Sequence, residues 1–400
     1  MIDSKSQAGL DRLHEAMAAR VAKGELPGMV TLVARGDAAH VDTIGTVAFG
    51  STEPMRRDTI FRITSMTKPI LALATMILVE DGALALDEPV DRLLPELADR
   101  RVLKRIDGPL DDTVPARRPI NIDDLLTFRM GHGLIMEPTF DPPFPIVNAA
   151  NEMGLVMGPP EPRTQHSPDE WLKRFATLPL IYQPGERWQY NTGSLVLGVL
   201  LARAARQPLG DFFRARIFGP LGMNETGFSM PAEKAGRLPR TYMTNFQTGK
   251  MEEQTASGPA VWTKPPIFPS GAAGLVSTID DYMAFARLLL NEGLHDGKRL
   301  VSQRSVRLMT TNHLTPEQIA TGGLILGGLG WGYGMSVAVA PDEVSSVPGR
   351  YGWNGGYGTQ WFNDPTRGLV AIAMTQVSDA LFNGTMTEFG KLAIDSSTES

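Results

Sequence analysis

The stretch KPILALATMILVEDG, at residues 68–82, restricts the possible folds more than any other part of the sequence. It predicts a helix from Ser65 to Glu80 that is apolar on nearly every side, and Gly82 is a suitable residue to end that helix. A helix without a polar face belongs in the middle of a protein rather than on its surface. We therefore expect the rest of the chain to fold around this segment.

Short apolar runs that alternate with glycines lie on both sides of this helix in the sequence, a pattern typical of antiparallel strands joined by tight turns. One group occupies residues 27–63, and the other follows a predicted helix at 277–293, with strands expected at 329–340, 349–356, 357–364 and 368–376. The residues between the two groups favour helices, at 121–128, 167–178, 194–205 and 211–218. They also include a proline-rich segment, 136–162, of a length that is often functional and can form one wall of a pocket.

This order of segments predicts an α+β fold, in which an antiparallel sheet is built from both chain ends and flanked by helices, with a mostly helical domain inserted between them. The predicted sheet domain is discontinuous and comprises residues 1–84 and 275–400, whereas the helical domain comprises 85–274. We expect the functional site to lie between the two. A length of 400 residues agrees with two domains, or with one large domain that carries insertions.

Composition excludes several classes of function. The net charge of −6 gives no reason to expect a nucleic acid or an anionic membrane surface as partner. The absence of cysteine excludes disulfides, thiolate metal sites and cysteine nucleophiles. No stretch approaches the roughly 18 to 20 apolar residues of a membrane span, and the N-terminus lacks the apolar core of a signal peptide. We therefore expect a soluble, cytoplasmic protein without nucleic-acid or membrane partners, whose oligomeric state the sequence leaves open.

Ser65 and Lys68 stand where an extended run gives way to the apolar helix, and no other lysine has a serine three residues before it. Three residues along an α-helix advance about 300° and about 4.5 Å, so the two side chains share a face. Serine is a weak nucleophile until a base removes its proton, and a lysine that is kept partly neutral by burial can be that base. The free N–H groups of a helix N-terminus can also stabilise negative charge on a substrate. Taken alone, the spacing also describes a serine near a helix start followed by a surface lysine.

Tyr190 is a candidate for the proton transfer that a leaving group requires. It lies in PGERWQYNTGSLVLG, between a turn at Pro184-Gly185 and a helix that begins near Thr192. A tyrosine hydroxyl beside a lysine can pass a proton in either direction. The alternative is an aromatic packing residue, a description that suits the neighbouring Trp188 better than Tyr190.

The glycine-rich stretch YGWNGGYG, at residues 351–358, is the third element. Glycines in a strand allow a ligand to approach the backbone closely, and a backbone N–H there could complete an oxyanion hole opposite Ser65. The alternative is a glycine-rich hairpin with no contact to a ligand.

In this order and at these separations, the three motifs resemble those of the serine β-lactamase and penicillin-binding protein superfamily. Within it, the chain is most similar to the class C β-lactamase-like carboxylesterases, also called family VIII esterases, from about residue 10 to 393. Three further segments resemble family landmarks: DLLT with GHGL (124–134), FGPLGMNET (218–226) and SGAAGLVSTIDDYMAF (270–285).

The resemblance implies a role for each matching residue. Ser65 would be the acylated nucleophile, Lys68 its general base, and Tyr190 the tyrosine that shares proton transfer with the lysine. The backbone N–H groups of Ser65 and Gly356 would form the oxyanion hole, and Gly355 would contact the substrate.

Two departures from the family pattern concern substrate binding. Trp353 occupies the start of the third motif, as W-x-G, where the β-lactamases carry a lysine that helps to bind a carboxylate. The absence of that lysine should weaken recognition of anionic β-lactams and favour neutral, apolar groups. Asn191 directly follows Tyr190, while Thr192 occupies the usual asparagine slot, so the assignment of Asn191 to substrate binding departs from the pattern.

The resemblance thus implies a serine carboxylesterase that hydrolyses short to medium acyl esters through an acyl-enzyme. The pocket would be walled by Trp353 and the 136–162 segment. The histidines show no metal-binding spacing, and no P-loop or convincing dinucleotide motif occurs, so we expect neither metal nor cofactor. His132 is expected to pack in a loop. Hydrolysis of β-lactams or D-amino-acid peptides, acyl transfer to an alcohol, and a catalytically silent scaffold or ligand sensor remain the alternatives.

Overall fold

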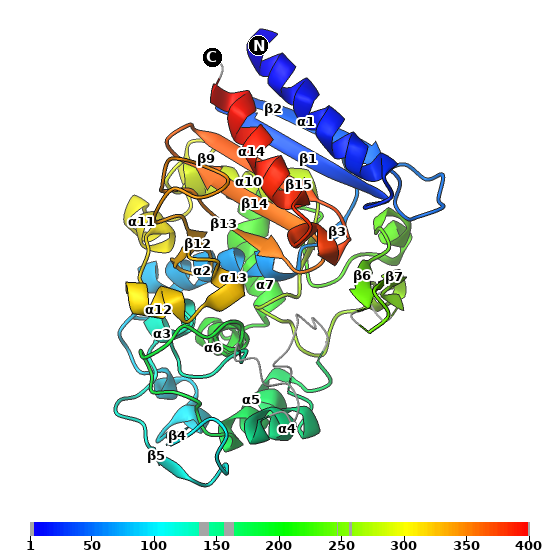
Figure 1. Cartoon of the computed structure of the whole chain (residues 1–400). Helices are drawn as coiled ribbons and strands as arrows, with labels where there is room; N and C mark the ends of the chain where they lie inside the picture. Colours follow the sequence, from blue (N-terminus) through cyan, green and yellow to red (C-terminus); the bar gives the residue numbers. More distant parts are fainter. Residues whose placement is uncertain (1–3, 136–143, 156–163, 246, 256–257, 399–400) are drawn as a thin grey trace.

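A large antiparallel sheet built from both ends of the chain organises the computed structural model (Figure 1), which describes residues 4–135, 144–155, 164–245, 247–255 and 258–398. The sheet has seven strands in the order β11-β12-β13-β14-β15-β1-β2. In chain order these are β1 (Gly28–Arg35), β2 (Ala38–Gly45), β11 (Gly330–Trp331), β12 (Ser336–Val337), β13 (Tyr351–Gly355), β14 (Thr359–Asp364) and β15 (Leu369–Met374). The pairing of β1 with β15, Val30 opposite Met374, joins the N-terminal and C-terminal strands and confirms the predicted fold class.

Helices cover both faces of this sheet. This cover is needed because β15 is apolar at every position and therefore has no face suited to water. Leu369, Ala371 and Ala373 face a core shared with α1 (Ser4–Ala22) and α14 (Thr385–Thr398). The alternate residues of β15 face the larger core that contains α2 (Thr67–Glu80) and α10 (Ile279–Leu290). Successive side chains of a strand point to opposite faces, so a strand buried on both sides must be apolar throughout.

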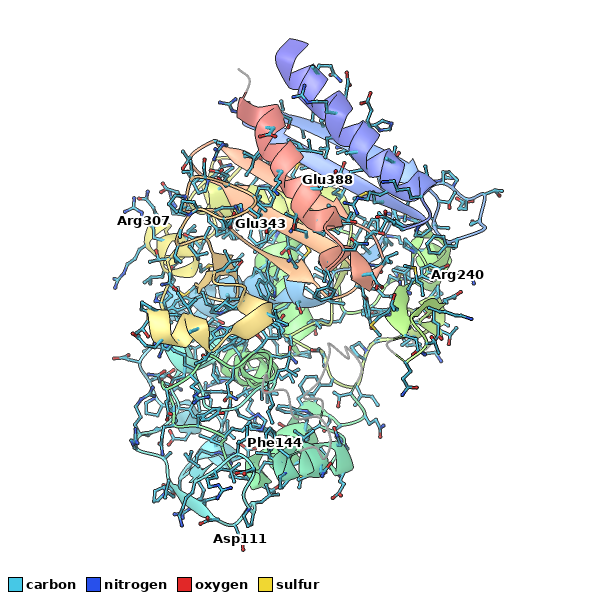
Figure 2. The ribbon with its side chains drawn as sticks, in the orientation of Figure 1. Asp111, Phe144, Arg240, Arg307, Glu343 and Glu388 are labelled. Atoms are coloured by element: carbon cyan, nitrogen blue, oxygen red, sulfur yellow. The ribbon has the colours of Figure 1, made fainter. Side chains whose placement is uncertain are left out.

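The helices α1 and α14 lie side by side across the outer face of the sheet (Figure 1). Glu388, labelled on α14 in Figure 2, forms an ion pair with Arg20 of α1, with Oε2 and Nη2 2.7 Å apart. Charged side chains such as Asp111, Arg240 and Arg307 project from the periphery in the same view.

The apolar stretch at residues 68–82 forms the central helix, as predicted. A 3-10 turn, η1 (Thr64–Met66), leads into α2 (Thr67–Glu80), and residues 67–78 are all buried. The helix ends at Gly82, which has φ +73°, and Ala83 N–H donates to Leu78 at 2.9 Å. Glycine adopts this left-handed conformation without steric penalty, which is why it commonly ends helices.

A mostly helical part of the chain packs against α2 on the side away from the sheet. Its helices include α3 (Ile122–Leu126), α5 (Pro168–Thr177), α6 (Thr192–Ala205) and α7 (Leu209–Phe213), which correspond to the predicted ones. The small sheet of β4 (Arg101–Leu103) and β5 (Thr113–Pro115) belongs to the same part. The hairpin of β6 (Tyr242–Asn245) and β7 (Lys250–Glu253) lies instead beside the segment that follows β15, where Tyr242 N–H donates to the Gln376 carbonyl at 2.8 Å. The division into domains at residues 84 and 274 stays a prediction.

The proline-rich segment 136–162 differs from the loop that was expected. Residues Pro145–Glu152 form a helix, α4, with proline at its first turn, where a missing N–H does no harm. The rest of the predicted pocket wall, 136–143 and 156–162, lies outside the described residues. Over the described part of the chain, no helix is both long and apolar enough to cross a membrane.

Candidate active site

Ser65 lies in η1, at the point where the backbone enters α2, and only 3% of its surface is exposed. The preceding residue, Thr64, has φ +40°, a left-handed conformation that is rare for a β-branched residue. Such strain persists only where the surrounding structure enforces it, and it is concentrated at functional sites. Here β13 packs directly against the segment. The approach is so close that a Cβ on Gly355 would overlap the Ile63 carbonyl oxygen and lie 2.7 Å from Thr64 Oγ1.

Lys68 lies one turn further along and contacts the serine directly. Its Nζ is 3.0 Å from Ser65 Oγ and 2.7 Å from the carbonyl oxygen of Ala272, to which it donates. The side chain is 1% exposed, and this desolvation lowers the pKa of Lys68 well below its usual value. Burial disfavours the charged amine, so Lys68 is poised to accept a proton.

Tyr190 completes this polar group from the other side. Its hydroxyl accepts a hydrogen bond from the Trp353 indole N–H at 2.9 Å, and Lys68 Nζ lies 4.5 Å from the centre of its ring. Desolvation raises the pKa of Tyr190 to about 12, although hydrogen bonds with Ser65 and Trp353 oppose the rise. Tyr190 therefore keeps its proton at neutral pH and has it available for donation.

The backbone around Tyr190 is held in an unusual conformation. Asn191 has φ +86° and ψ −56°, and Thr192 N–H donates back to the Tyr190 carbonyl at 3.3 Å. This is the rare, strained form of the γ-turn. Leu134 N–H donates to the same carbonyl at 2.9 Å, and a Cβ on Gly133 would lie 2.6 Å from it, so this approach requires glycine.

Asn191, assigned to substrate binding from the sequence, is 5% exposed. Its Oδ1 has no hydrogen-bond partner among the described residues. The structure thus places Asn191 beside Tyr190 in the chain, as the cap of α6, without giving its amide oxygen a role.

Trp353, expected to wall the pocket, is 7% exposed and is largely engaged with other side chains. Besides its hydrogen bond to Tyr190, its ring packs edge-to-face on Trp331, with centroids 4.7 Å apart. Gly355 is likewise in contact with protein, against Ile63 and Thr64. Gly356, the expected second oxyanion donor, begins the partly exposed turn from β13 to β14.

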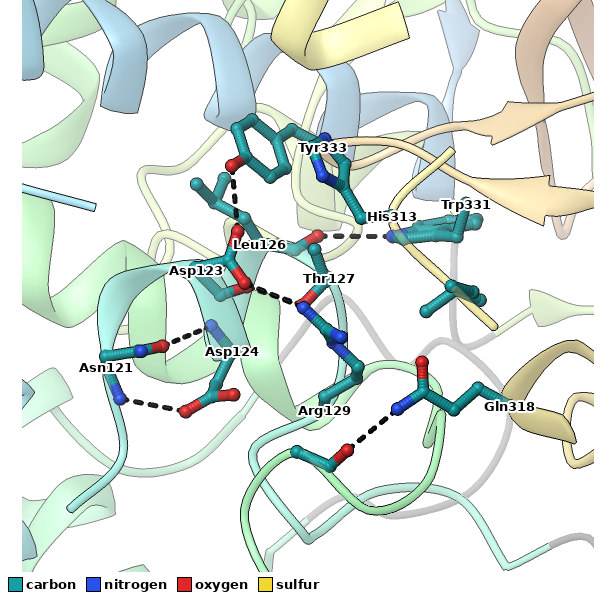
Figure 3. A network of polar contacts seen from close by, with 12 residues as sticks. Asn121, Asp123, Asp124, Leu126, Thr127, Arg129, His313, Gln318, Trp331 and Tyr333 are labelled. Atoms are coloured by element: carbon teal, nitrogen blue, oxygen red, sulfur yellow. Dashed lines mark hydrogen bonds and ion pairs between the residues drawn. The ribbon is translucent and has the colours of Figure 1, made fainter. Parts of the chain in front are cut away.

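A hydrogen-bond network under the site fastens the end of the sheet to α3 (Figure 3). Trp331 Nε1 donates to the Leu126 carbonyl at 3.1 Å, and the Tyr333 hydroxyl donates to Asp123 at 2.8 Å. Arg129 pairs with the same carboxylate at 2.8 Å. These contacts fix Trp331, and through it the edge against which Trp353 packs.

Two residues near the site were not predicted from the sequence. Ala272 accepts a hydrogen bond from Lys68 through its backbone oxygen, which no side-chain pattern can reveal, although it lies in one of the landmark segments. Tyr282 donates its hydroxyl to the Met66 carbonyl at 2.9 Å and so supports the turn that follows Ser65. A buried tyrosine in an apolar helix stripe is not distinguishable from a packing residue in sequence.

His132 is buried as predicted, with its ring edge against Phe175. Burial, with a contribution from the positive charge of Arg100, lowers the pKa of His132 to about 3, so the ring is neutral. Among the described residues, no group of three or more His, Asp or Glu side chains could hold a metal ion.

Comparison with known proteins identifies the family to which the chain belongs. A family model described as Beta-lactamase matches residues 13–388. Protein Rv1367c of Mycobacterium tuberculosis is 39% identical over 88% of this chain and 86% of its own length. Esterase EstB of Burkholderia gladioli is 30% identical over 96% and 94%, respectively.

The solved structure of EstCE1, described as a hydrolase with promiscuous acyltransferase activity, has the same fold. It aligns with a TM-score of 0.79 and 24% identity, covering 97% of this chain and 99% of EstCE1. The chain therefore belongs to the β-lactamase family and is a serine hydrolase.

Proposed function

We propose that this protein is a carboxylesterase of the family VIII type that cleaves short to medium acyl esters through an acyl-enzyme. The observation that carries the proposal is the contact of a buried amine with a serine hydroxyl, Lys68 Nζ to Ser65 Oγ at 3.0 Å, with burial disfavouring the charged form of the amine. The similarity to Esterase EstB supports an ester as substrate.

In the first half of the reaction, Ser65 Oγ bonds to the ester carbonyl carbon while its proton moves to Lys68. The oxyanion that forms accepts hydrogen bonds from the backbone N–H groups of Ser65 and Gly356. The bond to the alcohol oxygen then breaks as Tyr190 gives that oxygen its proton. The Lys68 ammonium restores the tyrosine proton, so the alcohol leaves with the serine acylated and the lysine neutral.

In the second half of the reaction, water attacks the acyl carbonyl carbon and passes a proton to Lys68. The bond to Ser65 Oγ breaks, the serine regains its proton, and the acid is released. An ester needs less assistance at the leaving group than an amide, because an alkoxide leaves more easily than an amine anion. Position 353 holds an indole rather than a lysine, so no positive charge from that position assists Tyr190. This arrangement suits the less demanding protonation of an alkoxide.

Trp353 also supports the choice of substrate. An indole offers no positive charge to a carboxylate, whereas it contacts neutral, apolar groups favourably. We therefore expect neutral acyl esters to be preferred over anionic β-lactams and D-amino-acid peptides. Acyl transfer to an alcohol is the second candidate function, favoured by the likeness to EstCE1, whose description includes acyltransferase activity.

The test is hydrolysis of p-nitrophenyl acetate, butyrate and octanoate by the wild type and by Ser65→Ala. Removal of the nucleophile should lower kcat by several orders of magnitude. Ser396→Ala removes another buried serine hydroxyl, on α14, and should leave turnover unchanged. No turnover by the wild type, or turnover that survives Ser65→Ala, would overturn the assignment.

Two additions to the assay separate the alternatives. A cephalosporin substrate reports β-lactam hydrolysis, and an added alcohol reports acyl transfer through a new ester product. A protein that forms no covalent adduct with any acyl donor and turns over none of these substrates would be a silent scaffold.

A further inference from the structure

We propose that Trp353 is a positioning residue that fixes the direction of the hydrogen bonds through Tyr190, Ser65 and Lys68. It thereby holds the Tyr190 hydroxyl as a proton donor toward the reacting oxygen. This inference rests on the proposed esterase function and goes beyond it, because Trp353 was expected only to line the pocket.

The two ends of the hydrogen-bonded chain have only one possible polarity. At one end, the indole Nε1 of Trp353 can only donate, and it lies 2.9 Å from the Tyr190 hydroxyl oxygen. At the other end, the backbone carbonyl of Ala272 can only accept, and it lies 2.7 Å from Lys68 Nζ. Neither end can reverse, whatever the protonation of the groups between them.

The groups between these ends can follow one direction throughout when Lys68 is neutral. Tyr190 accepts from Trp353, so its single proton is free to point to its other partner, Ser65. A neutral Lys68 that donates to Ala272 presents its lone pair to Ser65 Oγ, 3.0 Å away. In this arrangement the serine proton points to the lysine, and the tyrosine proton points to the serine oxygen.

Without the indole donor this direction is no longer enforced. The Tyr190 hydroxyl could then accept the Ser65 proton, which would withdraw that proton from Lys68 and turn the tyrosine proton away from the substrate. The serine oxygen and the leaving oxygen are bonded to the same carbon in the tetrahedral intermediate, so a proton aimed at one is close to the other. Trp353 thus matters most when the leaving group needs a proton.

The indole is itself held rigidly. Its ring meets Trp331 at 88° with centroids 4.7 Å apart, and Trp331 is anchored by its own N–H to Leu126 (Figure 3). Trp331 is therefore a matched control: it is a buried tryptophan of the same cluster, and it also donates its indole N–H, but to a backbone carbonyl rather than to Tyr190.

The test compares Trp353→Phe with Trp331→Phe on two butyrate esters. The p-nitrophenyl ester has a leaving group that needs no proton, whereas the ethyl ester has one that does. Trp353→Phe should lower kcat/KM for the ethyl ester about tenfold more than for the p-nitrophenyl ester, the size expected for one lost hydrogen bond. Trp331→Phe removes packing against the Trp353 ring but leaves the indole hydrogen bond to Tyr190 in place, so it should lower both by the same factor.

A double-mutant cycle with Tyr190→Phe assigns the effect to the hydroxyl. Once that hydroxyl is gone, Trp353→Phe should change the ratio between the two esters by less than about twofold. Trp353→His, which can retain a ring N–H donor, should restore part of the ethyl ester activity. Equal losses on both esters from Trp353→Phe, or an unchanged effect of that substitution in the Tyr190→Phe background, would overturn the proposal.

A second readout does not depend on the folding of Trp353→Phe. In wild-type protein labelled with ¹⁵N-tryptophan, one indole N–H signal should shift upfield and exchange faster with solvent when Tyr190 is changed to phenylalanine. If no indole signal responds, the proposal fails even where the enzyme turns over esters. A wild type without ester turnover would instead overturn the proposed function.

Discussion

Gly355→Ala should damage catalysis although the added methyl group is small and remote from solvent. A Cβ at this position would overlap Thr359 Oγ1 and the Ile63 carbonyl oxygen and lie 2.7 Å from Thr64 Oγ1, against at least 3.4 Å for ordinary contact. Either β13 or the turn before Ser65 must therefore move by at least about 0.7 Å. Two of these three atoms belong to the residues just before Ser65, so the nucleophile moves with them.

A displacement of this size is enough to disturb a reacting geometry. Misplacement of a catalytic group by about 1 Å can lower the rate by roughly 10²-fold. We therefore expect Gly355→Ala to lower kcat for p-nitrophenyl butyrate by about 10- to 100-fold, with a smaller change in KM. Thermal unfolding of the same variant should also occur at a lower temperature, because either the β13 backbone or the strained turn at Thr64 must distort.

Two other glycines separate displacement of the nucleophile from general destabilisation. Gly9→Ala places a methyl group 2.6 Å from Ser396 Cα between α1 and α14, far from the site, and should lower stability without lowering kcat. Gly236 has no atom within 4 Å of an added Cβ, so Gly236→Ala should change neither. If Gly355→Ala retains wild-type kcat, or if Gly9→Ala lowers kcat equally, β13 does not position Ser65 as described.

The remaining predictions concern the strained turn and the buried amine. Asn191→Gly should be more stable than Asn191→Ala by about 1 to 3 kcal/mol in denaturant unfolding, because glycine relieves the strain at φ +86°; equal stabilities would show that the turn is unstrained. Lys68→Met should be inactive but more stable than the wild type at neutral pH. Burial lowers the pKa of Lys68 in the folded state, so below the ordinary lysine pKa the unfolded chain binds a proton that the folded chain does not. The stability gained by Lys68→Met should therefore grow by up to about 1.4 kcal/mol per unit as the pH falls from that value, until the folded pKa is reached. A constant difference between pH about 10 and about 7 would mean that Lys68 stays protonated in the folded protein.

Much of the fold could be predicted because its central helix and its strands carry strong local patterns. The segment 67–78 is buried throughout, as an all-apolar helix requires, and the last strands are close to their predicted positions. The helix α4 was missed, since prolines in 136–162 suggested a loop, whereas a proline in the first turn of a helix is well tolerated.

The candidate site was predictable where it depends on spacing within one helix, and less so where it depends on contacts between distant segments. Ser65 and Lys68 are three residues apart, so helical geometry alone brings them together. The indole bond from Trp353 to Tyr190 spans 163 residues, and the bond from Lys68 to Ala272 spans 204, so only the assembled fold can create them. The strain at Thr64 and Asn191 is likewise imposed by neighbouring strands and loops, and neither residue type announces it.

The most direct test of the central claim is the rate at which a fluorophosphonate labels the protein, measured against pH for the wild type and Lys68→Met and located by peptide mass. A neutral Lys68 that removes the Ser65 proton predicts a single adduct on the Ser65 peptide. It also predicts that the rate rises with pH until the amine is neutral, and that Lys68→Met is slower by at least about 10²-fold. Labelling at another residue, or equal rates for the wild type and Lys68→Met, would contradict it.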